Sequence, residues 1–91
     1  MLALFNAESI IIECAQTARN RIAALTTLPH KEVVTSFVKG DDEELQVTCN
    51  FSIEAACEAS KKSKHEIEDG ARMILRVCAE EITLRLEGAG I

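Results

Sequence analysis

The sequence predicts a small α+β protein in the order helix, β-hairpin, helix. Apolar residues recur at three- and four-residue steps along residues 6–28 and again along residues 63–88, which is typical of amphipathic helices. Between these stretches, apolar and polar residues alternate along residues 45–53, which is typical of a β-strand. A chain of 91 residues has room for one hydrophobic core, so residues 1–91 are expected to form a single domain.

The first predicted helix covers residues 6–28, which contain neither Gly nor Pro. Asn6 is the candidate N-cap, and Pro29 is expected to stop the helix because the residue before a proline disfavours helical dihedrals. Ile10 and Ile12 flank the apolar stripe and make it wider than one neighbouring element would need. The stripe itself consists of Ile11, Cys14, Ala15, Ala18, Ile22 and Leu25.

A β-hairpin is predicted next, because residues 33–38 are rich in β-branched side chains and residues 45–53 alternate. The polar segment 39–44 between them contains Gly40 and is expected to be a loop of about four to six residues. Its acidic run, residues 41–44, lacks the ligand spacing of a calcium loop and is interpreted as a charged hairpin tip. Two strands alone are marginally stable in water, so the hairpin must lie on the helices, pair with another chain, or both.

The second helical region is expected to start near Ile53 and to be interrupted near residues 60–64. Ser52 is available to cap its first part. Ser63 and Glu66 have the spacing of a capping box, in which each side chain accepts a hydrogen bond from the backbone of the other residue. A new helix is therefore expected to begin after Ser63.

This last helix shows the strongest apolar periodicity, and Gly88 is its expected C-terminal cap. Two ion pairs between residues four apart, Glu68 with Arg72 and Glu81 with Arg85, are expected to support it. One apolar stripe consists of Ile67, Ala71, Ile74, Leu75, Cys78 and Ile82, and an adjoining stripe consists of Met73, Val77 and Leu84. Val47 and Phe51 of the hairpin are expected to face the interior together with Ile74 and Cys78.

Gly70 lies inside this helical pattern, where glycine costs ~1 kcal/mol relative to alanine. We expect that it lets another backbone approach closely, at a position beside Ile74 and Val77. The alternative is that Asp69 and Gly70 mark a kink or a later helix start.

Charge and hydropathy limit the classes of partner. The formal net charge is −5, from 10 Lys and Arg against 15 Asp and Glu, and the whole acidic excess lies in residues 39–91. Such a surface disfavours general binding to nucleic acids or anionic membranes. The mean hydropathy of +0.06 is high for a domain that buries only roughly 60–65% of its unfolded surface, so a partner is expected to cover the surplus. Neither a signal peptide nor about 20 consecutive apolar residues is found, so a cytoplasmic protein with reduced thiols is expected.

A metal site would have to be assembled from Cys49, Cys57, Cys78 and His65. The sequence contains no C-x2-C or H-x3-H pair to begin such a site, so no metal or other cofactor is predicted. Cys14 and Cys78 fall on apolar helical stripes and Cys49 on the apolar face of a strand. These thiols are expected to pack as small hydrophobic side chains.

A catalytic thiol is not predicted either. Cys57 is the one cysteine near basic residues, with Lys61 and Lys64 one and two turns later if the helix continues. A nucleophilic pair would also need His30 or His65 beside the thiol. Both histidines fall in polar segments and are expected to be solvated.

Lys61, Lys62 and Lys64 form the one basic cluster and are the candidate anion contact, because they lie near a predicted helix N-terminus. Four acidic residues lie close by, and no aromatic side chain interleaves with the lysines to stack a base. The cluster is therefore interpreted as a solvated joint between two helical segments. No glycine-rich phosphate loop accompanies it.

These observations favour a small, acidic, non-enzymatic protein–protein interaction module with an accessory or regulatory role. It is expected to be a homodimer, formed through the hairpin edges or through the long C-terminal helix, and to bind another protein as well. One alternative is a nucleic-acid-binding regulator that uses the three lysines together with Arg72 and Arg76. Another is a domain that binds a small ligand between the hairpin and the helices.

Overall fold

The computed structural model describes residues 2–39 and 45–90. It confirms a mostly helical α+β domain with the predicted order of elements. The elements are α1 (Leu2–Thr26), a 3-10 turn η1 (His30–Glu32), β1 (Val34–Lys39), β2 (Leu45–Asn50), α2 (Ile53–Ser60) and α3 (Lys64–Gly88). None of the described helices is both long enough and apolar enough to cross a bilayer.

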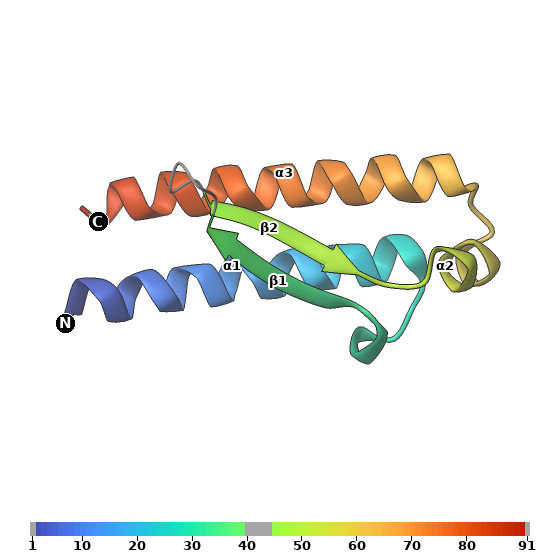
Figure 1. Cartoon of the computed structure of the whole chain (residues 1–91), viewed down its shortest axis with the longest axis horizontal. Helices are drawn as coiled ribbons and strands as arrows, with labels where there is room; N and C mark the ends of the chain where they lie inside the picture. Colours follow the sequence, from blue (N-terminus) through green and yellow to red (C-terminus); the bar gives the residue numbers. More distant parts are fainter. Residues whose placement is uncertain (1, 40–44, 91) are drawn as a thin grey trace.

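The long helices α1 and α3 lie side by side and antiparallel, and the hairpin lies over one face of this pair (Figure 1). The short helix α2 closes the end at which α1 finishes and α3 begins. The molecule is 45 Å long, close to the length of a 25-residue helix at about 1.5 Å per residue plus its flanking segments. The fold thus has one helical layer and one β layer. In the part of the chain that the structure describes, no strand lies on the face of the helix pair that is turned away from the hairpin.

Helix α1 begins at Leu2, so Asn6 lies inside the helix and its prediction as the N-cap is wrong. The preceding residues Leu-Ala-Leu-Phe contain no helix breaker, and the helix therefore extends through them. At its other end the helix stops before Pro29, as predicted. Thr27 there has a left-handed backbone with φ 59°. The buried Thr26 hydroxyl donates to the carbonyl of Ile22 at 2.7 Å, which fixes the last turn.

The hairpin is confirmed as an antiparallel pair of strands in which Phe37 stands opposite Val47 and Thr35 opposite Cys49. Val33, which was expected to open the first strand, precedes β1 and is completely buried. The predicted hairpin tip at residues 41–44 lies outside the described residues.

Helix α2 begins at Ile53 as predicted, and β2 ends at Asn50, three residues before the alternating pattern does. The Ser52 hydroxyl accepts a hydrogen bond from the amide of Ala55 at 3.1 Å, which confirms the predicted cap. The alternating pattern continues through Phe51 although the strand has ended. Polar–apolar alternation alone does not report where a helix cap interrupts a strand.

The predicted interruption near residues 60–64 is confirmed. Helix α2 ends at Ser60, and Lys61 adopts a left-handed backbone with φ 63°. The capping box is present as predicted: the Ser63 hydroxyl accepts from the Glu66 amide at 3.1 Å, and the Ser63 amide donates to the Glu66 carboxylate at 3.3 Å. At the far end Gly88 is the last helical residue and Ala89 is the C-cap, so the expected glycine cap is wrong by one position.

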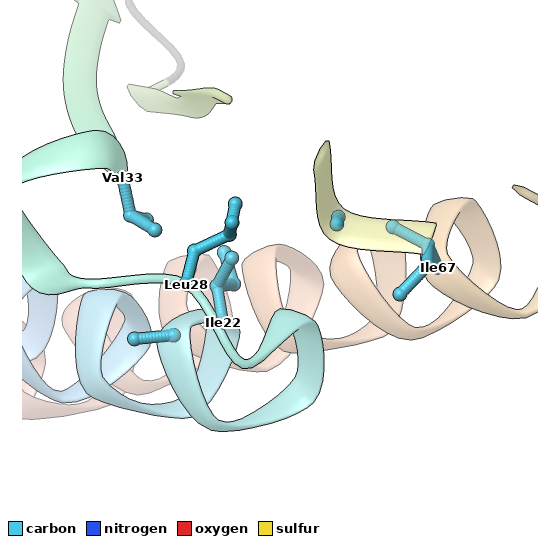
Figure 2. Close-up of a cluster of buried hydrophobic side chains, with 6 residues drawn as sticks. Ile22, Leu28, Val33 and Ile67 are labelled. Carbon is cyan, nitrogen blue, oxygen red and sulfur yellow. The ribbon is translucent and has the colours of Figure 1, made fainter. Parts of the chain in front are cut away.

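Two clusters of buried side chains hold the layers together. The first lies at the α2 end and is shown in Figure 2; it contains Ile22, Ala23, Leu28, Val33, Ala56 and Ile67. The second lies further along the helix pair and contains Ile10, Cys14, Ala18, Cys78 and Ile82. Ile74 packs against both clusters, Phe51 against the first and Val47 against the second. Val47 and Phe51 thus face the helices as expected, although each remains half-buried.

Gly70 is packed closely, as expected, but its neighbour is the side chain of Leu25 on α1 and not a backbone. Helix α3 starts at Lys64, so Gly70 does not mark a helix start. The expected pair between Glu68 and Arg72 is replaced by one between Arg72 and Asp69, at 3.0 Å. Residues three apart are also neighbours on a helix surface, so Arg72 can reach either Glu68 or Asp69.

Candidate functional site

A hollow of about 280 Å³ lies between α1 and α3. Its α1 wall consists of Cys14, Thr17, Ala18 and Arg21, and its α3 wall consists of Ile74, Val77, Cys78, Glu81 and Arg85. Among the described residues, none of the hairpin lines it, so it is not the pocket between hairpin and helices that the sequence suggested for a small ligand. The inward side chains of the hairpin, including Val47 and Cys49, instead pack against the two clusters.

Two cysteines meet at the floor of this hollow. The Cys78 thiol points at the carbonyl oxygen of Cys14, with Sγ 3.4 Å from that oxygen, and both residues are buried. Burial raises the pKa of the Cys78 thiol above its usual 9.0, and the neighbouring Cys14 raises it further. The placement of both thiols on packed helical stripes agrees with the sequence-based expectation.

Arg85 covers this pair from the solvent side. Its Nη1 lies 3.7 Å from Cys14 Sγ, and its Nη2 donates to Oε2 of Glu13 at 3.3 Å. The expected pair between Glu81 and Arg85 on the same helix is therefore wrong, because the guanidinium reaches across to α1 instead. Sequence reasoning missed this contact between Arg85 and Cys14, since the register of α3 against α1 could not be read from either helix alone.

The remaining residues of the hypothetical metal site are not brought together. Cys49 and Cys57 pack against the first cluster, whereas Cys78 belongs to the second. His65 pairs with Asp69 at the exposed start of α3, at 3.0 Å. Within residues 2–39 and 45–90, no three or more His, Cys, Asp or Glu side chains gather as metal ligands would.

Within the described residues, neither histidine hydrogen-bonds to a thiol, as a nucleophilic pair would require. His30 Nε2 lies 2.8 Å from Oδ1 of Asn20 on α1. The backbone carbonyl of His30 accepts from Arg19, with distances of 3.0 Å to Nε and 2.6 Å to Nη2. These bonds tie the η1 turn to α1, whereas Cys57 of α2 packs against the first cluster.

The three lysines have different surroundings. Lys62 donates from Nζ to the backbone carbonyl of Leu25 at 3.3 Å, near the C-terminus of α1, where a cation is favourable. Lys61 forms the left-handed cap of α2, and Lys64 is the first residue of α3. The side chains of Lys61 and Lys64 are exposed. The candidate anion contact therefore retains two exposed lysines, and the third ties α1 to the α2–α3 joint.

An exposed apolar row runs along α3. Met73 is 60%, Val77 43% and Leu84 63% exposed. Their spacings of four and seven residues place them on one face of the helix, and Val77 also lines the hollow. Arg76 and Glu80 flank this row and are exposed as well. We refer to Met73, Val77 and Leu84 as the outer row; the sequence identified it as a second stripe but did not assign it a role.

Comparisons of the chain with protein-family models, with curated proteins and with solved structures find no match. No family is therefore assigned, and the function has to be inferred from the outer row and from the hollow between α1 and α3.

Proposed function

We propose that this protein is a small, non-enzymatic protein–protein interaction module with an accessory or regulatory role, and that it acts as a homodimer. The observation that carries the proposal is the outer row, in which three large apolar side chains of one helix are 43–63% exposed. Single exposed apolar residues are ordinary, whereas three on one face of a long helix are typical of a contact surface.

A second copy of the chain is the partner that fits the outer row. In an antiparallel contact centred midway between Met73 and Leu84, each Met73 lies against Leu84 of the second copy, and the two Val77 side chains lie near the centre. Such a two-fold contact uses the same residues on both sides. Met73 and Leu84 are matched with each other, and Val77 of each copy lies beside the stem of Glu80 of the other.

The charges beside the row support the same arrangement. Arg76 and Glu80 lie on the same flank and are nearly symmetric about the centre defined by Met73 and Leu84. The antiparallel contact therefore brings Arg76 of one copy to Glu80 of the other, twice. In a parallel two-fold contact these flanks would lie on opposite sides of the interface, and Arg76 would not meet Glu80. Opposite charges at the rim of an interface select orientation more than they add affinity.

The nucleic-acid alternative has less support from the positions of the lysines. Lys62 hydrogen-bonds to the carbonyl of Leu25, and Arg72 pairs with Asp69, so two of the five basic side chains already have partners. The net charge of −5 also opposes binding to phosphates in general. We expect no binding to random DNA or RNA at physiological salt. Binding whose salt dependence weakens when Lys61, Lys62 and Lys64 become Gln would favour that alternative.

Light scattering tests the dimer. We expect a mass of twice 10.0 kDa at micromolar concentrations. Leu84→Gln should raise the dissociation constant about 100-fold, because each copy loses the burial of one leucine, worth about 1.5 kcal/mol or more. Ile12→Gln, at an apolar α1 side chain that is 55% exposed and not part of the row, is the matched control and should leave the mass unchanged.

Two outcomes would contradict this assignment. A mass of 10.0 kDa at every concentration would remove the homodimer. Dissociation by Val34→Gln, at a β1 side chain that is 53% exposed, combined with no effect of Leu84→Gln, would place the contact at the hairpin instead.

A further inference from the structure

Two thiols and a cation line the hollow. Cys14 comes from α1, and Cys78 and Arg85 come from α3. Cys14 and Cys78 are in direct contact through the 3.4 Å approach of Sγ to the Cys14 carbonyl oxygen. Arg85 places its guanidinium 3.7 Å from the Cys14 sulfur. Both cysteines line the hollow and each is 5% exposed, so the hollow is the side from which a small reagent approaches the thiols.

We propose that Cys14 and Cys78 form a thiol-modification site for small anionic disulfides of the glutathione type. In the first step the Cys14 thiolate attacks one sulfur of the disulfide, a Cys14 mixed disulfide forms, and one low-molecular-weight thiolate leaves. In the second step the Cys78 thiolate attacks Cys14 Sγ, the Cys14–Cys78 disulfide forms, and the second small thiolate leaves. The two protein thiols lose two electrons in total, and the small disulfide gains both.

The order of the two thiols follows from their surroundings. Arg85 Nη1 lies 3.7 Å from Cys14 Sγ, so Cys14 is the sulfur that has a cation beside it when it attacks the disulfide. Within residues 2–39 and 45–90 the Cys78 thiol contacts the Cys14 carbonyl and no cation, and burial raises its pKa. Cys14 is therefore the attacking thiol and Cys78 the resolving one.

The class of reagent follows from the walls of the hollow. Arg21 lines the hollow and is exposed, so its guanidinium is available to a carboxylate of the reagent. Arg85 is shared between Cys14 and Glu13. Glu81 is the acidic residue of the lining and lies on the α3 wall. Ala18, on the α1 wall, adds apolar contact surface, so a small molecule with an anionic end and a sulfur at its centre fits this lining.

The other two cysteines serve as internal references. Cys49 and Cys57 pack against the first cluster, away from the hollow. Burial raises the pKa of Cys49, and the charge of Arg19 offsets this only in part. Both are more exposed than Cys14 but lie outside the hollow, so the proposal requires them to react more slowly than Cys14 while the protein is folded. This inference does not depend on the proposed dimer, because all of its residues belong to one copy.

The experiment is to incubate the folded, reduced protein with oxidised glutathione and to follow each cysteine by peptide mass mapping. We expect a Cys14–Cys78 disulfide to accumulate first. In Cys78→Ala, whose fold is checked by circular dichroism, we expect one glutathionyl group to remain on Cys14. Arg85→Gln should slow the modification of Cys14 about five- to tenfold, the loss expected for one charge about 4 Å away, whereas Arg72→Gln, outside the hollow, should not.

Preferential reaction of Cys49 or Cys57, or equal rates at all four thiols, would overturn the proposal. Release of glutathione from Cys14 at the same rate in wild type and Cys78→Ala would show that Cys78 does not resolve the mixed disulfide. Equal rates in wild type and Arg85→Gln would remove the role of the guanidinium. The wild-type rates remain informative even if a variant fails to fold.

Discussion

A Cβ atom on Gly70 would stand 2.8 Å from Cδ2 and 3.0 Å from Cδ1 of Leu25, so α3 meets α1 more closely there than an alanine would permit without a shift. The same leucine accepts a hydrogen bond at its carbonyl from Nζ of Lys62, at 3.3 Å. Leu25 therefore joins the end of α1 both to the start of α3 and to the segment that precedes it. These two contacts of Leu25 help to set the distance between α1 and α3, the helices that line the hollow.

The Gly70 contact predicts coupling between two substitutions. Gly70→Ala should gain ~1 kcal/mol of helix propensity, but most of that gain should be lost in displacing the Leu25 methyl groups. In a Leu25→Ala background the full gain of ~1 kcal/mol should appear, because the obstruction is gone. Urea unfolding of wild type, Gly70→Ala, Leu25→Ala and the double variant measures this coupling. Equal gains from Gly70→Ala in the two backgrounds would show that the close approach has no energetic effect.

The first cluster predicts unequal effects of the same substitution at two isoleucines. Ile67 is completely buried, and Ile67→Ala should lower the free energy of unfolding by about 3–4 kcal/mol through lost burial and a new cavity. Ile12 is 55% exposed, and Ile12→Ala should change it by less than about 0.5 kcal/mol. Chemical denaturation monitored by circular dichroism measures both. Similar losses at the two positions would mean that the packing of α3 is wrong.

The capping box predicts that a small polar side chain stabilises the start of α3. Ser63→Ala should lower the free energy of unfolding by about 1 kcal/mol, because the Glu66 amide loses its acceptor. Ser9 is exposed inside α1, where alanine is the better helix former, so Ser9→Ala should raise stability by about 0.5 kcal/mol. Opposite signs for the two serines are the expected result in thermal or urea unfolding. A loss at Ser9 as large as that at Ser63 would argue against the cap.

The buried thiols predict a loss of stability in alkaline solution. The pKa of Cys78 and that of Cys49 are raised in the folded protein, mainly by burial. Between 9.0 and these raised values the unfolded chain releases protons that the folded chain keeps, so the free energy of unfolding falls as pH rises above 9.0. The chain contains no tyrosine to titrate in that range.

Urea unfolding on either side of pH 9.0 measures this loss. It should be smaller in the double variant Cys49→Ala/Cys78→Ala, which lacks both titrating groups. An alkaline loss of the same size in wild type and in the double variant would refute the assignment to these thiols.

The order of elements and both serine caps could be predicted because each rests on residues close together in the chain. Ser52 and Ser63 each cap a helix through an amide three residues later, and Pro29 interrupts a helix by local sterics. The wrong positions also have local causes. Asn6 is a good capping residue, but Leu2 and the residues after it extend the helix past it.

The candidate sites depended on contacts between distant residues, which periodicity does not report. Cys14 and Cys78 were both recognisable as members of apolar stripes, but their meeting requires the register of α1 against α3. That register is set in part by the approach of Gly70 to Leu25. Arg85 illustrates the same limit, since its pairing with Glu13 spans 72 positions, whereas the sequence offered Glu81 four positions away.

The central claim, a homodimer formed through the outer row of α3, is tested most directly by sedimentation equilibrium on a charge-exchange series. Wild type should sediment at twice 10.0 kDa, and Arg76→Glu and Glu80→Arg should each shift the equilibrium towards the monomer by placing like charges at both symmetric pairs. The double variant Arg76→Glu/Glu80→Arg should restore the dimer, because it rebuilds both pairs in reverse. A wild type that sediments at 10.0 kDa throughout, or a double variant no better associated than the single variants, would contradict the account.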